Sequence, residues 1–190
     1  MTYDLYPEIS IEGTKKAYEG YSEVLSEIKN EIKRRDANII TIECYPGTFE
    51  AELSENLIQE LEPDLVLHSD DIFLSSSEIT ERIQYHLTDD RVFGIMSQHT
   101  FNDFIQYDRL EQAKRKIKEN KGKRIVVYGV GASIITVGDI FIYANLARWE
   151  IQKRFRNKTI GNWKGDNKEE DTLRKVKRAY FFLSGESLTN

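Results

Sequence analysis

Short aliphatic and β-branched runs alternate along this chain with longer segments in which apolar residues recur every three or four positions. Strand-like runs occupy residues 38–43, 65–68, 123–128 and 140–143, and helical periodicity occupies residues 14–34, 48–61, 77–87, 101–118, 145–156 and a short stretch around residues 173–180. Residues 91–96 form either a further strand or a buried extended segment. Strands that alternate with helices predict an α/β fold with a parallel sheet of about five strands, covered by helices on both faces.

The length of 190 residues suits one domain, which we expect to carry a helical N-terminal extension (1–37) and a basic C-terminal segment (148–182). The single cysteine, Cys44, excludes an internal disulfide and a multi-cysteine metal site, and the three histidines lack the spacing of a zinc site. No run approaches the roughly 18 apolar residues of a membrane span, and the N-terminus lacks a signal-peptide core. We therefore expect a cytoplasmic protein with no membrane partner.

Charge is distributed unevenly along the chain. The net charge is −5, yet residues 148–178 contain eleven Lys and Arg against five Asp and Glu, a net of +6. Such a segment either contacts phosphate, nucleic acid or an acidic partner, or forms a solvated helix face. No nucleic-acid recognition motif accompanies it, which disfavours nucleic acid as the partner.

The turn after the first predicted strand is the first candidate site, because ligands of parallel sheets bind beyond the carboxyl ends of the strands. Gly47 and Thr48 precede a helix, whose N-terminal N–H groups favour phosphate, and Thr48 is a candidate N-cap. A P-loop would have a lysine after this glycine, and none is present, so transfer from ATP is in doubt. An ordinary strand–helix turn is the alternative. Cys44 beside the turn is either activated by the helix N-terminus or packed as a small buried side chain.

Two further strand ends carry candidate residues. Asp70 and Asp71 are candidate catalytic carboxylates: Asp70 would face Mg²⁺ or act as the base toward a substrate hydroxyl, whereas a solvated turn is the alternative. The loop with Gly129, Gly131 and Ser133 would let a ligand or a neighbouring loop approach the backbone. It lacks the third glycine of a dinucleotide fingerprint.

The predicted helix at residues 145–156 carries arginines along one face. Arg148, Gln152 and Arg156 are four residues apart, so Arg148 and Arg156 are candidate phosphate ligands. Arg154 points nearly the opposite way, and Glu150 is placed to pair with it.

The order of these pieces resembles the nucleoside-kinase branch of P-loop proteins, to which uridine kinase belongs. The segments IECYPGTFEAEL, HSDDIF, TDDRVFG, YGVGAS, YANLARWEIQKRFR and NWKGDN are more specifically similar to a domain that precedes a cupin domain in some bacterial proteins related to class I mannose-6-phosphate isomerase. The resemblance covers about residues 38–182. It implies a P-loop NTPase-like three-layer sandwich, with Mg²⁺ and ATP or another nucleotide as cofactors and a cupin-type partner domain.

Isomerase activity is not implied, because that chemistry resides in the cupin, and a chain of 190 residues does not include one. The chain is then either an N-terminal domain cut from a longer protein or a standalone relative. Our expectation is a protein that binds a nucleotide or a sugar phosphate. It either transfers phosphate or, lacking the Walker lysine, acts as a ligand-sensing or partner-docking module.

Overall fold

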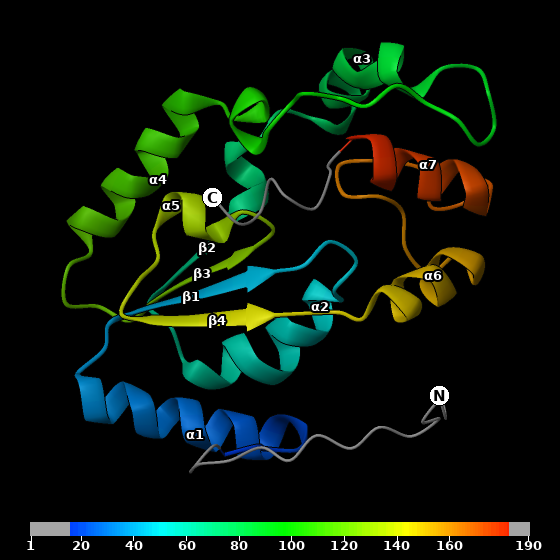
Figure 1. The fold of residues 1–190 in the computed structure, drawn as a ribbon. Coiled ribbons are helices and arrows are strands. Elements are labelled where there is room, and N and C mark those ends of the chain that lie inside the picture. Colours follow the sequence, from blue (N-terminus) through cyan, green and yellow to red (C-terminus); the bar gives the residue numbers. More distant parts are fainter. Residues whose placement is uncertain (1–15, 183–190) are drawn as a thin grey trace, which may run out of the picture.

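The computed structural model describes residues 16–182, and its centre is a parallel β-sheet (Figure 1). The strands are β1 (Ile39–Cys44), β2 (Leu65–His68), β3 (Ile125–Gly129) and β4 (Ile140–Ala144), in the order β2-β3-β1-β4. Every neighbouring pair is parallel. The expected α/β fold with a parallel sheet is confirmed, with four strands in the described part rather than about five.

Helices lie on both faces of this sheet and beyond its carboxyl ends (Figure 1). On one face lie α1 (Gly20–Arg35) and α2 (Glu50–Leu53), which continues through a π turn (Ser54–Ile58) and a 3-10 turn (Gln59–Leu61). On the other lie α4 (Tyr107–Glu119) and α5 (Ala132–Ile135). The remaining helices are α3 (Ser76–Leu87), α6 (Arg148–Arg156) and α7 (Thr172–Phe182), and short 3-10 turns occupy Ser69–Ile72 and Phe101–Phe104.

The central strands are buried on both faces, which explains their nearly continuous apolar sequence. Ile40 and Ile42 of β1, and Val126 of β3, are completely buried. Thr41 faces the opposite side from its neighbours and is also buried. Its hydroxyl is satisfied there, because it donates a 3.0 Å hydrogen bond to the carbonyl of Thr136. By contrast, β4 lies at the edge of the sheet and leaves Phe141 half exposed.

Residues 91–96 do not form the strand that their apolar sequence allows. The carboxylate of Asp90 accepts hydrogen bonds of 2.7 Å from the N–H groups of Val92 and Phe93, which holds the chain in a turn. Phe93 is 70% exposed, and no strand pairs with this segment within residues 16–182. A strand needs a partner as well as an apolar pattern, and the segment is mostly exposed, so both the strand and the buried interpretation were wrong.

Several cations of the basic C-terminal segment are buried rather than solvated. Lys175 is fully buried, and its Nζ donates to the carbonyls of Phe155 (2.7 Å), Lys168 (2.9 Å) and Ile160 (3.5 Å). These contacts fasten α7 to the end of α6 and to the loop that follows it. Within residues 16–182, no helix is both long and apolar enough to cross a membrane. The N-terminal part of the extension, including the expected helix start at Thr14, lies outside the described residues, and α1 begins at Gly20.

Candidate functional site

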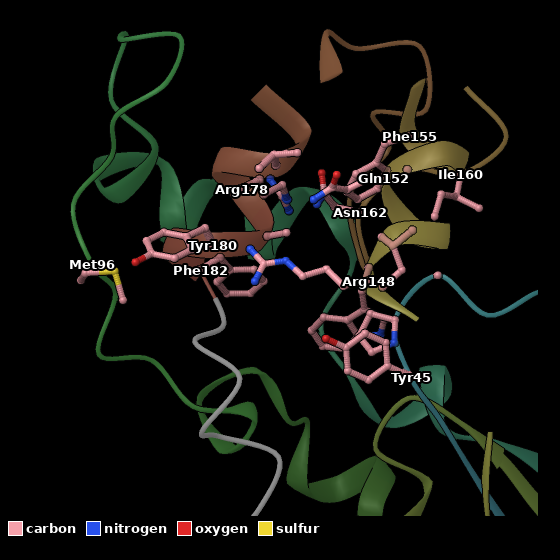
Figure 2. A pocket seen from close by; sticks show the side chains of 17 residues that line it. Tyr45, Met96, Arg148, Gln152, Phe155, Ile160, Asn162, Arg178, Tyr180 and Phe182 are labelled. Carbon is pink, nitrogen blue, oxygen red and sulfur yellow. The ribbon is translucent and has the colours of Figure 1, made fainter. Parts of the chain in front are cut away.

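A cavity of about 610 Å³ lies beyond the carboxyl end of β1, between the β1–α2 turn, α6 and α7 (Figure 2). This volume is in the range of small-molecule sites. The side chains around it are mainly aromatic and aliphatic. The complete lining is Tyr45, Pro46, Gly47, Met96, Arg148, Ile151, Gln152, Phe155, Ile160, Gly161, Asn162, Trp163, Val176, Arg178, Ala179, Tyr180 and Phe182.

The charged side chains in this lining are two arginines. Arg178 is 5% exposed and is held by hydrogen bonds from its Nη2 to Thr80 Oγ1 (3.2 Å) and to the carbonyl of Lys164 (3.0 Å). Its guanidinium also lies over the ring of Phe182, 5.7 Å from the centroid. Burial lowers the pKa of Arg178 below its ordinary value, because the charged form loses solvation. Its Nε and the nearby indole N–H of Trp163 are buried without an acceptor within residues 16–182.

Arg148 approaches the same cavity from the other side. It is the first residue of α6, it is exposed, and its side chain extends into the cavity toward Phe182 and Tyr180 (Figure 2). Neither Arg148 nor Arg178 forms an ion pair with a carboxylate in the described part of the chain. Two positively charged side chains thus line this cavity, and none of the described carboxylates does.

The β1–α2 turn contributes Gly47 to this cavity but uses the donors of Thr48 internally. The Thr48 hydroxyl donates to the carbonyl of Tyr45 (2.5 Å) and approaches that of Ala144 (3.4 Å), and the Thr48 N–H also donates to Tyr45 (3.1 Å). Thr48 is not the N-cap either, because α2 begins at Glu50 and its N-cap is Phe49. Gly47 needs to be glycine, since its φ is +98° and an added Cβ would lie 3.0 Å from Ile160.

The three arginines of α6 make different contacts. The expected pair between Arg154 and Glu150 is confirmed at 3.2 Å. Arg154 also donates from Nη1 to the carbonyl of Gly47 at 2.8 Å, so it fastens α6 to the β1–α2 turn. Arg156 lies outside the cavity lining, with its guanidinium 5.2 Å from the ring of Trp149 and a 3.4 Å hydrogen bond to Gln152. The structure therefore brings together Gly47 and Arg148, and leaves Arg156 apart.

The predicted catalytic carboxylates also lie outside the cavity lining. The Asp70 carboxylate pairs with Lys164 at 3.1 Å, and Lys164 Nζ donates to the Asp70 carbonyl as well. Asp71 is exposed. Within residues 16–182, no group of three or more His, Cys, Asp or Glu side chains is arranged to hold a metal ion.

The glycine loop after β3 is closed by a carboxylate of the chain itself. Glu43, at the end of β1, is 7% exposed and accepts hydrogen bonds from the N–H groups of Gly131 (2.6 Å) and Ser133 (2.8 Å). Gly129 and Gly131 permit close packing: an added Cβ would lie 2.3 Å from Ser69 Oγ at Gly129 and 2.8 Å from Phe73 at Gly131. The approach predicted for a ligand or a neighbouring loop is therefore made here by Glu43, Ser69 and Phe73.

Two features of the candidate site were not predicted from the sequence: the place of Arg178 in the cavity wall and the contact of Arg154 with Gly47. A signal for Arg178 was present: it lies four residues before Phe182, so an aromatic end buried in the core places Arg178 on the same inward helix face. The contact of Arg154 with Gly47 spans 107 residues of sequence, and local spacing carries no information about it.

Comparison with known proteins gives one match. The model of a family described as a domain of unknown function (DUF8485) matches residues 20–182, which includes every element from α1 to α7. Neither the curated proteins nor the solved structures contain a match to the chain.

Proposed function

The chain belongs to the DUF8485 family of domains of unknown function, and from its cavity we propose that it binds a small phosphorylated molecule, a nucleotide or a sugar phosphate. The observation that carries the proposal is the pair Arg148 and Arg178. They come from different helices, line one cavity and have no carboxylate partner within residues 16–182. Guanidinium groups bind phosphate oxygens through charge-assisted hydrogen bonds, and a phosphate between the two would relieve their mutual repulsion.

Burial of Arg178 strengthens this proposal. A buried cation without a direct ion pair is unfavourable. The hydroxyl and carbonyl oxygens, together with the charge of Glu170 beyond ion-pair distance, compensate only part of the lost solvation, since the pKa of Arg178 is lowered. An anion in the cavity would supply the missing compensation. The free energy of that interaction would appear as ligand affinity and as a rise in the stability of the bound protein.

We further propose that the fold is an altered P-loop NTPase-like three-layer sandwich that binds rather than transfers phosphate. The β1–turn–α2 unit within a parallel sheet supports the fold. Three features argue against transfer: no lysine follows Gly47, the donors of Thr48 are used within the turn, and the carboxylate of Glu50 stands at the start of α2. An acidic residue there repels the phosphate that a working P-loop would hold.

Isothermal titration with ATP, UMP, mannose 6-phosphate and inorganic phosphate tests the binding proposal. Arg148→Gln removes an exposed guanidinium without disturbing the core, and loss of its hydrogen bond to an anion should weaken binding by about 10- to 100-fold. Arg156→Gln is the matched control, an arginine of the same helix outside the cavity, and should leave affinity unchanged. Failure of every phosphorylated compound to bind at millimolar concentration would refute the proposal.

Incubation with Mg²⁺, ATP and a panel of nucleosides and sugars tests the absence of transfer. We expect ligand binding without turnover. A phosphorylated product whose formation is lost in Asp70→Asn or Asp71→Asn would instead establish the phosphotransferase alternative, with those carboxylates as its catalytic residues.

A further inference from the structure

We infer that the ligand of this cavity is an amphipathic monophosphate, with one phosphate group on an aromatic or branched aliphatic body, bound without a metal ion. This inference rests on the proposed function of the same site and specifies the class of ligand. It follows from the composition of the cavity wall, from the polar groups that are already engaged, and from the balance of charge.

The wall favours an apolar body over a sugar. Phe155 and Phe182 are 5% and 3% exposed, and Ile151, Ile160 and Val176 continue the apolar surface between α6 and α7. Each sugar hydroxyl placed against such a wall would give up its hydrogen bonds to water without replacing them. An aromatic or branched aliphatic group has no hydrogen bonds to lose, and its burial is favourable.

The two amide side chains of the wall are engaged by the protein itself, whereas the indole N–H of Trp163 has no acceptor within residues 16–182. The Nδ2 of Asn162 donates to the carbonyl of Lys175 (2.9 Å), and its Oδ1 accepts from Asn167 (2.8 Å). The Oε1 of Gln152 accepts from Arg156 (3.4 Å). Recognition of several hydroxyls requires several unengaged donors and acceptors, and the oxygen of each of these amides already accepts a hydrogen bond from the protein.

The charge balance fits a single phosphate group without Mg²⁺. The two guanidinium groups match the charge of a monophosphate, which is between −1.5 and −2 near pH 7. Mg²⁺ in proteins is held by carboxylates, and the lining contains no Asp or Glu. Asp70, which the sequence suggested as a metal ligand, is paired with Lys164, and both residues lie outside the cavity lining.

The positions of the two arginines indicate where the phosphate would bind and where the apolar group of the ligand would pack. Arg178 is fixed in the wall by Thr80 and by the carbonyl of Lys164, whereas Arg148 is exposed and reaches in from the first turn of α6 (Figure 2). A phosphate between them would lie beside Phe182 and Tyr180, so an apolar group attached to it can pack against these rings; Tyr180 is 57% exposed.

Titration calorimetry in excess EDTA tests the inference with five probes: naphthyl phosphate, mannose 6-phosphate, inorganic phosphate, naphthol and naphthoate. We expect naphthyl phosphate to bind at least about tenfold more tightly than mannose 6-phosphate, since burial of even a few methylene-sized groups has that effect. Naphthol should bind far more weakly, and replacement of EDTA by Mg²⁺ should leave the affinity for naphthyl phosphate unchanged. Naphthoate, which carries a carboxylate on the same body, tests whether the phosphate itself is required and should bind more weakly than naphthyl phosphate.

Two tyrosine variants separate recognition of the body from recognition of the phosphate. Tyr180→Ala should weaken naphthyl phosphate several-fold and leave inorganic phosphate unaffected. Tyr107→Ala is the control, because Tyr107 is 60% exposed and lies outside the cavity lining. Arg148→Gln should weaken every phosphate compound.

The outcomes distinguish this inference from the function on which it rests. Equal affinity for all three phosphate compounds, lost in Arg148→Gln, would overturn the inference and leave phosphate binding standing, as would a requirement for Mg²⁺. Binding of naphthoate as tight as that of naphthyl phosphate would overturn the assignment of a phosphate group. Binding of naphthol that matches naphthyl phosphate and is indifferent to Arg148→Gln would overturn both, and so would the absence of binding by every probe.

Discussion

Arg154 donates a hydrogen bond of 2.8 Å from its Nη1 to the carbonyl oxygen of Gly47. The same guanidinium lies 3.8 Å from the ring centroid of Phe49 and pairs with Glu150, so one side chain connects α6 to both sides of the β1–α2 turn. Only 15% of the Arg154 side chain is exposed. Because Gly47 and residues of α6 line the cavity, this contact joins two parts of its wall.

Arg154→Lys should therefore destabilise the protein by about 1–3 kcal/mol, since lysine keeps the charge but loses the planar donor geometry and the stacking on Phe49. Urea denaturation measures the change. Lys153→Met is the control, because Lys153 also pairs with Glu150 but is 52% exposed, and surface pairs contribute little. Equal stability of the two variants would show that the contact with Gly47 does not stabilise the fold.

Cys44 should be inert toward thiol reagents in the folded protein. Desolvation, with a contribution from the nearby charge of Glu50, raises its pKa to about 12, and its side chain is buried at the end of β1. The thiolate is the reactive form, so labelling by an aromatic disulfide near neutral pH should be slow and should accelerate with urea. Fast labelling of the folded chain would contradict this and would indicate that the turn opens. The structure thus confirms Cys44 as a small buried side chain rather than an activated nucleophile.

His68 should make stability depend on pH. Its Nε2 lies 2.6 Å from the Glu50 carboxylate, and this hydrogen bond raises its pKa above the ordinary value of 6.5 against the opposing effect of desolvation. A raised pKa in the folded state means that the stabilisation is fully present below the unfolded-state pKa. It is lost as pH rises through the folded-state pKa.

The difference in unfolding free energy between the wild type and His68→Gln should thus be larger near pH 5 than near pH 8. Denaturation at several pH values measures it, and Glu50→Gln should remove most of the same difference and shift the NMR titration of His68 downward. A difference that is constant with pH would mean that the pair does not form in solution.

The fold class could be predicted from the sequence because strands and helices differ in the local spacing of their apolar residues. The run Ile39–Cys44 is buried on both faces of the sheet, and a parallel strand buried in this way has a nearly continuous apolar sequence. Residues 91–96 have a similar apolar content but lack a pairing partner within residues 16–182, and pairing depends on the rest of the chain. Local spacing therefore predicted four strands correctly and could not decide between the two interpretations of residues 91–96, neither of which the structure shows.

The candidate site was predictable only in part for the same reason. Gly47 was found from a turn and Arg148 from four-residue spacing along a predicted helix, both local features. Arg178 and Lys164 are two among many basic residues of their segment, and what sets them apart is contact with Thr80 and Asp70, 98 and 94 residues away. Composition showed that cations cluster in this segment, but not which of them are buried.

The carboxylate of Glu43 occupies the glycine loop after β3. A charged acceptor bonded to two N–H groups in a buried site is a strong contact, so Glu43→Gln should destabilise the protein by about 2–4 kcal/mol. Glutamine retains one acceptor oxygen and presents its NH₂ group to the other N–H.

Glu60→Gln is the control, an exposed glutamate of the helical segment that follows α2. The affinity of Glu43→Gln for phosphate compounds, measured at a temperature where the variant is folded, separates the two interpretations of the loop. If Glu43 closes the loop structurally, stability falls and affinity stays the same, because the proposed ligand site lies between α6 and α7. If the loop with Gly129, Gly131 and Ser133 is the ligand site, removal of the competing carboxylate charge should raise the affinity for phosphate.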